Sequence, residues 1–294
     1  MTDLAMDIAD AEQRARYPEH GWAVNSQGQR LLWFPLLHLV ENVQVFRQQR
    51  GIESPISAGA MGERKFLVDT LKKYVRALRE LHRVGRHARD YSIDFDSSAF
   101  RSQEASTART HAAEMGPLFI DLALIYLRRL ADRITVATAP VLFESFESAP
   151  REYKNLIGSV KANRIDGFKP ICDVCKLRKA VEEHSSWFSA LRGTNADGKK
   201  GLRDAVEHRG VILWPHLTQI GNSRPTYEVT MFSRSRDVMP VGNVLDSIAE
   251  HNSGLCAFMS ALCDAAGWRG SYGARDVFLV VGDEEDVTAL WPQL

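Results

Sequence analysis

Three side chains with complementary chemistry fall within a short stretch, from Arg203 to His208. Arginine keeps its positive charge at physiological pH, and its planar guanidinium matches a phosphate group. Histidine changes protonation near neutral pH and can act as a general acid or base. Asp204 lies four residues before His208, so on a helix its carboxylate shares a face with the imidazole and can orient it. The segment therefore has the residue types needed to bind a phosphate and to move a proton beside it.

The same positions also have a purely structural interpretation. On a solvated helix, Arg203 with Glu207 and Asp204 with His208 would form i,i+4 pairs, each worth about 0.2–0.5 kcal/mol. His208 near the end of that helix complements the helix dipole, and Gly210 is a typical stop. A site for chemistry and an ordinary helix end are both consistent with these residues.

The order of these residues resembles the signature of the HEPN superfamily, a family of helical bundles that share an Arg, four to six residues and a His. Arg203 and His208 are separated by four residues here, and Asp204 is the polar residue favoured directly after the Arg. The preceding helical segment carries an aromatic pair, Trp187-Phe188, which is also similar to the family. The resemblance indicates a HEPN-like helical fold.

This similarity covers residues 181–210 and implies metal-independent cleavage of RNA without a cofactor. His208 would assist attack by the ribose 2′-hydroxyl or protonate the leaving oxygen. Arg203 would hold the scissile phosphate and stabilise its developing charge, and Asp204 would orient the ring or the Arg. The resemblance also implies a homodimer in which two motifs face one cleft, and a toxin or phage-defence endoribonuclease acting on RNA.

A non-catalytic helical module is the second functional hypothesis. Many members of the superfamily serve as interaction modules, so a HEPN-like bundle that binds a protein partner or a nucleic acid also fits the motif. The chain is longer than a minimal bundle of this family, and the β-rich segment that follows the motif has no required place in the pattern. The resemblance therefore supports the fold better than the activity.

Two cysteines, Cys172 and Cys175, have the CxxC spacing of half a zinc knuckle or of a redox pair. His184 is a candidate third ligand, but no second CxxC or paired histidines follow at zinc-finger spacing. Cys256 and Cys263 lie on an apolar helical segment and are typical of core positions. We therefore predict no metal and no cofactor, with Cys172 and Cys175 as the alternative zinc ligands.

The composition narrows the class of protein. The chain has 294 residues with 37 Lys and Arg against 37 Asp and Glu, and this zero formal charge disfavours a protein that coats polyanions. The N-terminus lacks the pattern of a secretory signal, and charged residues interrupt the most apolar run, 117–143. We expect a cytoplasmic protein that does not span a membrane.

One helical segment, 63–84, carries a basic stripe: Lys72, Lys73, Arg76, Arg79, Arg83 and, just beyond it, Arg86. A solvated helix face is the usual interpretation of such a stripe. A surface that follows the RNA backbone is the alternative, and that function requires the stripe to lie beside His208.

The elements that must position the motif are mostly helical, because apolar residues recur at helical spacing along most of the chain. Helices are predicted over 31–46, 63–84, 99–137 with a break at Pro117, 153–160, 173–191, 199–209 and 243–266. After Gly210, two β-rich runs, 210–220 and 226–233, flank a turn sequence and predict a hairpin, and 277–281 predicts a last strand.

The predicted fold class is mainly α, a helical bundle with a small antiparallel β-hairpin appendage near the C-terminal third. Residues 1–60 are expected to form an N-terminal helical extension. Residues 61–294 are expected to form the HEPN-like bundle, with the hairpin at about 210–234. The two parts are expected to make one compact domain.

Overall fold

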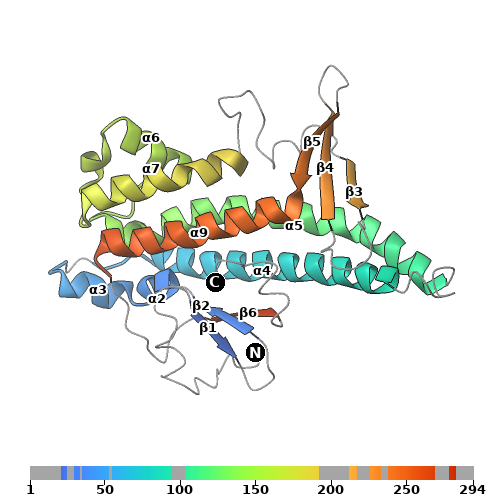
Figure 1. Ribbon diagram of the computed structural model, residues 1–294. Coiled ribbons are helices and arrows are strands. Elements are labelled where there is room, and N and C mark those ends of the chain that lie inside the picture. Colours follow the sequence, from blue (N-terminus) through green and yellow to red (C-terminus); the bar gives the residue numbers. More distant parts are fainter. Residues whose placement is uncertain are drawn as a thin grey trace.

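Two long antiparallel helices, α4 (Ala58–Ile93) and α5 (Gln103–Leu142), form the frame of the protein (Figure 1). The computed structural model describes residues 21–24, 30–33, 35–52, 55–93, 103–191, 212–216, 226–232, 238–268 and 278–282. Glu63, near the start of α4, pairs with Arg133 late in α5, with 2.7 Å between the charged atoms. Most of the described residues lie in helices, which confirms the mainly helical class.

Shorter helices cover the α5 side of this pair. Figure 1 shows α6 and α7 as one outer layer, α5 and α9 as the middle layer, and α4 on the other side. A single buried apolar cluster draws residues from every helix of these layers. The other helices among the described residues are α2 (Pro35–Glu41), α3 (Val43–Gln49), α6 (Tyr153–Lys161), the 3₁₀ helix η3 (Ile165–Phe168), α7 (Val174–Leu191) and α9 (Val244–Ala266).

The predicted break at Pro117 is wrong, because α5 continues through this residue. Proline inside a helix removes one backbone hydrogen bond and costs about 3 kcal/mol. Met115 and Phe119, one on each side of Pro117, both pack against Val84 of α4. Packing on α4 before and after the proline therefore holds the two halves of α5 in one helix.

Helix α9 ends where its backbone turns at Gly267, which has a φ of 70°. Its N–H donates to the carbonyl of Asp264, and the N–H of Trp268 donates to that of Cys263, the pattern of a Schellman cap. The Arg50 guanidinium donates to the carbonyls of Ala266 and Ile171 and so ties this end of α9 to the start of α7. A Cβ at Gly267 would lie 2.8 Å from this guanidinium and would require Arg50 to move, and the positive φ itself favours glycine.

A three-stranded antiparallel sheet follows the segment that carries the motif. Its strands are β3 (Ile212–His216), β4 (Thr226–Phe232) and β5 (Val238–Asn243), in that order. β3 and β4 pair over the two runs, 210–220 and 226–233, that the sequence assigns to a hairpin. β5 adds a third strand that the sequence analysis did not predict, and it leads directly into α9.

A second sheet joins the two ends of the chain and corrects the predicted helix 31–46. β1 (Gly21–Val24), β2 (Arg30–Trp33) and β6 (Phe278–Gly282) are antiparallel, with β2 in the middle. The short apolar run of β2 has no decisive period of its own, and pairing with β6 makes it a strand. The helix begins only at Pro35, because proline suits the first turn of a helix.

Helices α2 and α3, residues 35–49, pack against α4, α5 and α9. α2 and α3 contribute Leu36, Val40 and Phe46 to the same buried cluster as the long helices. None of the helices within the described residues is long and apolar enough to cross a membrane.

Candidate functional site

The three motif residues, Arg203, Asp204 and His208, lie in the segment 192–211, outside the described residues. The helix predicted at 199–209 lies outside them too. Their predicted contacts therefore stay predictions. Both flanking elements are described: α7 ends at Leu191 and β3 begins at Ile212.

Both flanking elements contact the long helix α5, and they do so at different places along the bundle. α7 packs along α9, β3 contacts α5, and β4 contacts α9 (Figure 1). The N–H of Asp173, beside the first turn of α7, donates to the carbonyl of Ala265 at 2.9 Å, so α7 and α9 run antiparallel. The C-terminal end of α7 consequently lies next to the N-terminal half of α9.

A cluster of aromatic and histidine side chains fills the interface between α6, α7 and α9. The ring of Phe258 on α9 makes edge contacts with Tyr153 of α6 and His184 of α7, with centroids 5.0 and 6.3 Å apart. Burial lowers the pKa of His184 and raises that of Tyr153. These groups are therefore uncharged near neutral pH, as a packed interface requires.

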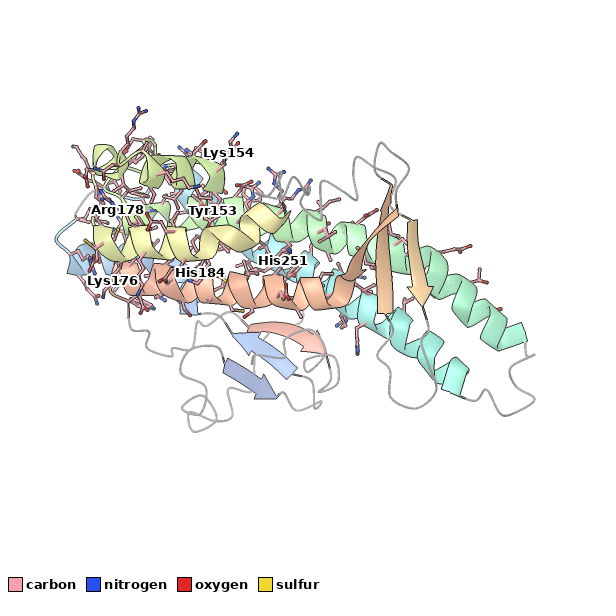
Figure 2. The ribbon with its side chains drawn as sticks, turned by 45° about the horizontal axis from the view of Figure 1, so that its top comes forward. Tyr153, Lys154, Lys176, Arg178, His184 and His251 are labelled. Atoms are coloured by element: carbon pink, nitrogen blue, oxygen red, sulfur yellow. The ribbon has the colours of Figure 1, made fainter. Side chains whose placement is uncertain are left out.

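His251 lies two helical turns before Phe258, on the same face of α9. Figure 2 shows it close to the C-terminal end of α7, where the chain leads into the segment with the motif. Only 5% of His251 is exposed, and its Nε2 has no hydrogen-bond partner among the described residues. Burial lowers the pKa of His251 to about 4, so the ring is neutral at pH 7.

Sequence reasoning missed His251, because a single His in an amphipathic helix belongs to no motif. A neutral buried imidazole can accept or donate one hydrogen bond, but it brings no charge to bind a phosphate. His251 lies beside the end of α7, the last described element before the motif, and it does not replace His208.

Asn252, the next residue of α9, makes a buried polar contact on a different side of the helix. The Tyr74 hydroxyl of α4 donates to Asn252 Oδ1, and both residues are fully buried. Burial raises the pKa of Tyr74 and of the neighbouring Cys256 thiol. This contact fixes how α9 lies on α4 and exposes no reactive group.

The alternative zinc ligands lie at the start of α7 and just before it. Cys172 is partly buried, Cys175 is exposed, and both are free thiols at the start of α7. His184 lies nine residues after Cys175 on the same helix, and its ring packs on Phe258. Within the described ranges no three His, Cys, Asp or Glu side chains are close enough to hold a metal ion.

Cys172 also lacks the environment of a reactive thiol. Burial raises its pKa to about 11, whereas reactive cysteines have a lowered pKa. The backbone N–H of Lys176 in the first turn of α7 binds Asp173 Oδ1 at 3.1 Å. The CxxC segment therefore begins a helix.

A cavity of about 520 Å³ opens at the end of α5. In its wall the buried Arg47 guanidinium donates to the carbonyls of Pro140, Phe143 and Glu144 at 2.8, 3.2 and 3.1 Å. The Glu144 carboxylate pairs with Lys169 at 3.4 Å. Arg47 is thus held by the end of α5 and Glu144 by Lys169, while Glu147, also in the wall, accepts from the Ser145 hydroxyl at 3.3 Å.

The basic stripe predicted on α4 lies on the surface as far as the side chains are described. Lys72, Lys73, Arg76 and Arg83 are exposed and Arg79 is partly exposed, whereas the Arg86 side chain is not among those described. The position of this basic stripe relative to His208 stays a prediction, because His208 is not among the described residues.

Comparison of the chain with protein-family models, with curated proteins and with solved structures finds no match.

Proposed function

We propose that this chain is a HEPN-like, metal-independent endoribonuclease of the toxin or phage-defence type. Arg203 and His208 are its catalytic residues, and Asp204 is a positioning residue. The observation that carries the proposal is the Arg-x4-His sequence itself, set between α7 and β3. The mainly helical frame supports it, since the resemblance implies a helical bundle.

The proposed reaction uses a nucleophile that belongs to the substrate. The ribose 2′-oxygen attacks the neighbouring phosphorus, the bond to the 5′-oxygen breaks, and the products are a 2′,3′-cyclic phosphate and a 5′-hydroxyl. A neutral His208 accepts the proton of the 2′-hydroxyl, or a protonated His208 donates one to the leaving 5′-oxygen. Arg203 binds the non-bridging oxygens and stabilises their negative charge in the transition state.

The proposal includes a homodimer and a cytoplasmic location. Two motifs facing one cleft would supply one imidazole as base and another as acid within a single turnover. In the cytoplasm such an enzyme meets RNA directly.

The deciding experiment measures cleavage of labelled RNA by the purified protein in the presence of a chelator. We expect His208→Ala to lower the rate about 10²–10⁴-fold, because the variant has no general acid or base at this position. Arg203→Ala should lower the rate about 10²–10³-fold, because the variant has no charge-stabilising donor there. His111→Ala and Arg151→Ala, which change exposed residues of the same types, should keep the wild-type rate.

The products and the substrate chemistry provide an internal check on this experiment. A 2′-deoxy substitution at the cleavage position should block the reaction, and the 5′ fragment should end in a cyclic phosphate. Equal rates for wild type, His208→Ala and Arg203→Ala would contradict the catalytic assignment. A wild-type protein that cleaves no RNA would favour the second hypothesis, a non-catalytic module that binds a protein or a nucleic acid.

A further inference from the structure

Helix α4 has one side in the core, contacts β6 along part of its length and leaves a row of side chains exposed. Its buried side includes Leu71, Leu78 and Leu81, which pack in the central cluster. Seen down the helix axis, Lys65, Lys72, Arg76 and Arg83 lie opposite that side, because steps of 7, 4 and 7 residues return to nearly the same direction. We define the α4 basic face by this row with its neighbours: Lys65, Lys72, Lys73, Arg76, Arg79 and Arg83.

This face is locally rich in positive charge although the whole chain is neutral. Its six cations share the surface with two acids, Asp69 and Glu80, both partly exposed. Glu80 pairs with Arg79 at 3.6 Å and with Arg83 at 4.0 Å. The other four cations of the face form no ion pair with any described residue, and the side chains of all four are exposed.

The N-terminal end of the face presents an aromatic ring beside the cations. Phe66, which follows Lys65, is 52% exposed, an unusual position for a large apolar side chain. The Arg133 guanidinium of α5 lies over this ring at 5.0 Å from its centre. A half-exposed ring next to a row of cations is the combination with which proteins bind single-stranded nucleic acid, through backbone charge and base stacking.

We propose that the α4 basic face binds the backbone of single-stranded RNA and that Phe66 stacks on one of its bases. The row from Lys65 to Arg83 extends about 27 Å along α4, enough for several nucleotides of one strand. A single strand is favoured over a duplex, because a base must be unstacked from its neighbours before it can lie on an aromatic ring. The assignment of the bound strand as RNA rests on the proposed nuclease function, and single-stranded RNA is then the substrate class of that nuclease.

The test measures binding of a labelled 2′-O-methyl RNA strand by fluorescence anisotropy over a range of salt concentrations. This probe has no free 2′-hydroxyl, so the proposed reaction cannot cleave it. The double variant Lys72→Glu/Arg76→Glu should raise the Kd about tenfold or more. The slope of log Kd against log salt should fall by about 1.4, at about 0.7 for each phosphate that the variant no longer neutralises.

A matched control changes the same net charge elsewhere. Lys154→Glu/Lys161→Glu alters two exposed lysines of α6, which lies on the far side of the α5–α9 layer from α4 (Figure 1). This control should keep the wild-type Kd within about twofold. Circular dichroism on each variant checks that the helices are intact.

Stacking is tested separately from charge. Phe66→Ala should raise the Kd about tenfold and leave the salt slope unchanged, because no charge is removed. Leu118→Ala, at an apolar position with similar exposure on α5, should bind as the wild type does.

Each outcome decides a different question. Equal affinity of the α4 and α6 double variants overturns the proposal, and so does a wild-type protein that does not bind the probe. If the α4 variant loses binding and the wild-type protein cleaves no ordinary RNA, this pair of results supports RNA binding by the α4 basic face and contradicts the nuclease function. If cleavage depends on His208 and the α4 variant binds RNA as the wild type does, the nuclease function is supported and RNA binding by the α4 basic face is contradicted.

Discussion

Burial keeps His251 in its neutral form at the interface of α7 and α9. An imidazolium at this position would lose its hydration without gaining a described hydrogen-bond partner at Nε2. The pKa of His251 therefore falls to about 4, against about 6.5 for a histidine in an unfolded chain. This one side chain makes the packing of the two helices sensitive to acid.

We expect the free energy of unfolding to decrease as the pH falls from about 6.5 to about 4. In this interval the unfolded chain binds a proton at His251 and the folded chain does not, so acid favours unfolding. The contribution of His251 reaches about 1.4 kcal/mol per pH unit. Urea unfolding of wild type and His251→Gln at pH 7, 6 and 5 measures it, and the variant should show a shallower pH dependence.

The matched control for this measurement is His111→Gln, which changes an exposed histidine of α5. It should keep the pH dependence of the wild type. If His251→Gln and the wild type lose stability equally between pH 7 and pH 5, the buried neutral state of His251 is contradicted.

At the scale of a secondary-structure element, the C-terminus of α5 depends on a side chain from another helix. The last carbonyls of a helix lack partners within it. The N–H of Glu144 donates to the carbonyl of Lys169 and so leaves the carbonyl of Pro140 to be satisfied from outside. Arg47 of α3 supplies that donor, and it also reaches the carbonyls of Phe143 and Glu144.

Replacing Arg47 with Met should lower the free energy of unfolding by about 3 kcal/mol or more, because buried carbonyls lose charge-assisted hydrogen bonds. Arg47→Lys, which keeps the charge but not the planar set of donors, should lose less. Thermal and urea unfolding measure both variants. Arg151→Met, at an exposed arginine over the Phe146 ring, should change stability by less than about 1 kcal/mol. Equal losses for Arg47→Met and Arg151→Met would contradict the capping role.

At the scale of the whole molecule, one core connects helices that are far apart in the sequence. Cys256 and Cys263 of α9 lie in that core with 4% exposure each, and burial raises the pKa of both thiols. Cys172 is partly buried, whereas Cys175 is exposed. Two of the four cysteines thus lie in the core, one at its edge and one on the surface.

A thiol-specific reagent should therefore label the native protein in distinct phases. Cys175 should react fastest and Cys172 more slowly. Cys256 and Cys263 should react only at the rate of global unfolding, because opening the core is the route to them. Mass spectrometry of the labelled peptides at increasing urea measures these rates. Cys175→Ser should abolish the fast phase and Cys256→Ser should not, and rapid labelling of Cys256 without urea would contradict the single core.

The sequence predictions were accurate for elements that depend on residues close together in the chain, and they failed for elements that depend on distant partners. α6, α7 and α9 begin and end within one residue of their predicted bounds, because each has a strong apolar period and clear ends such as Asp173 and Gly267. β5 was missed, and β2 was assigned to a helix, since a short strand gains its hydrogen bonds only from partners elsewhere in the chain.

For the candidate site, residue type and spacing identified Arg203, Asp204 and His208 and the chemistry available to them. Those properties are local, so the sequence by itself determined them, together with the helical class and the basic row on α4. Only the tertiary structure decided that Pro117 lies inside one helix, that the two ends of the chain share a sheet and that His251 is buried beside α7. These features depend on contacts between residues distant in sequence, and no local pattern encodes which distant surfaces will meet.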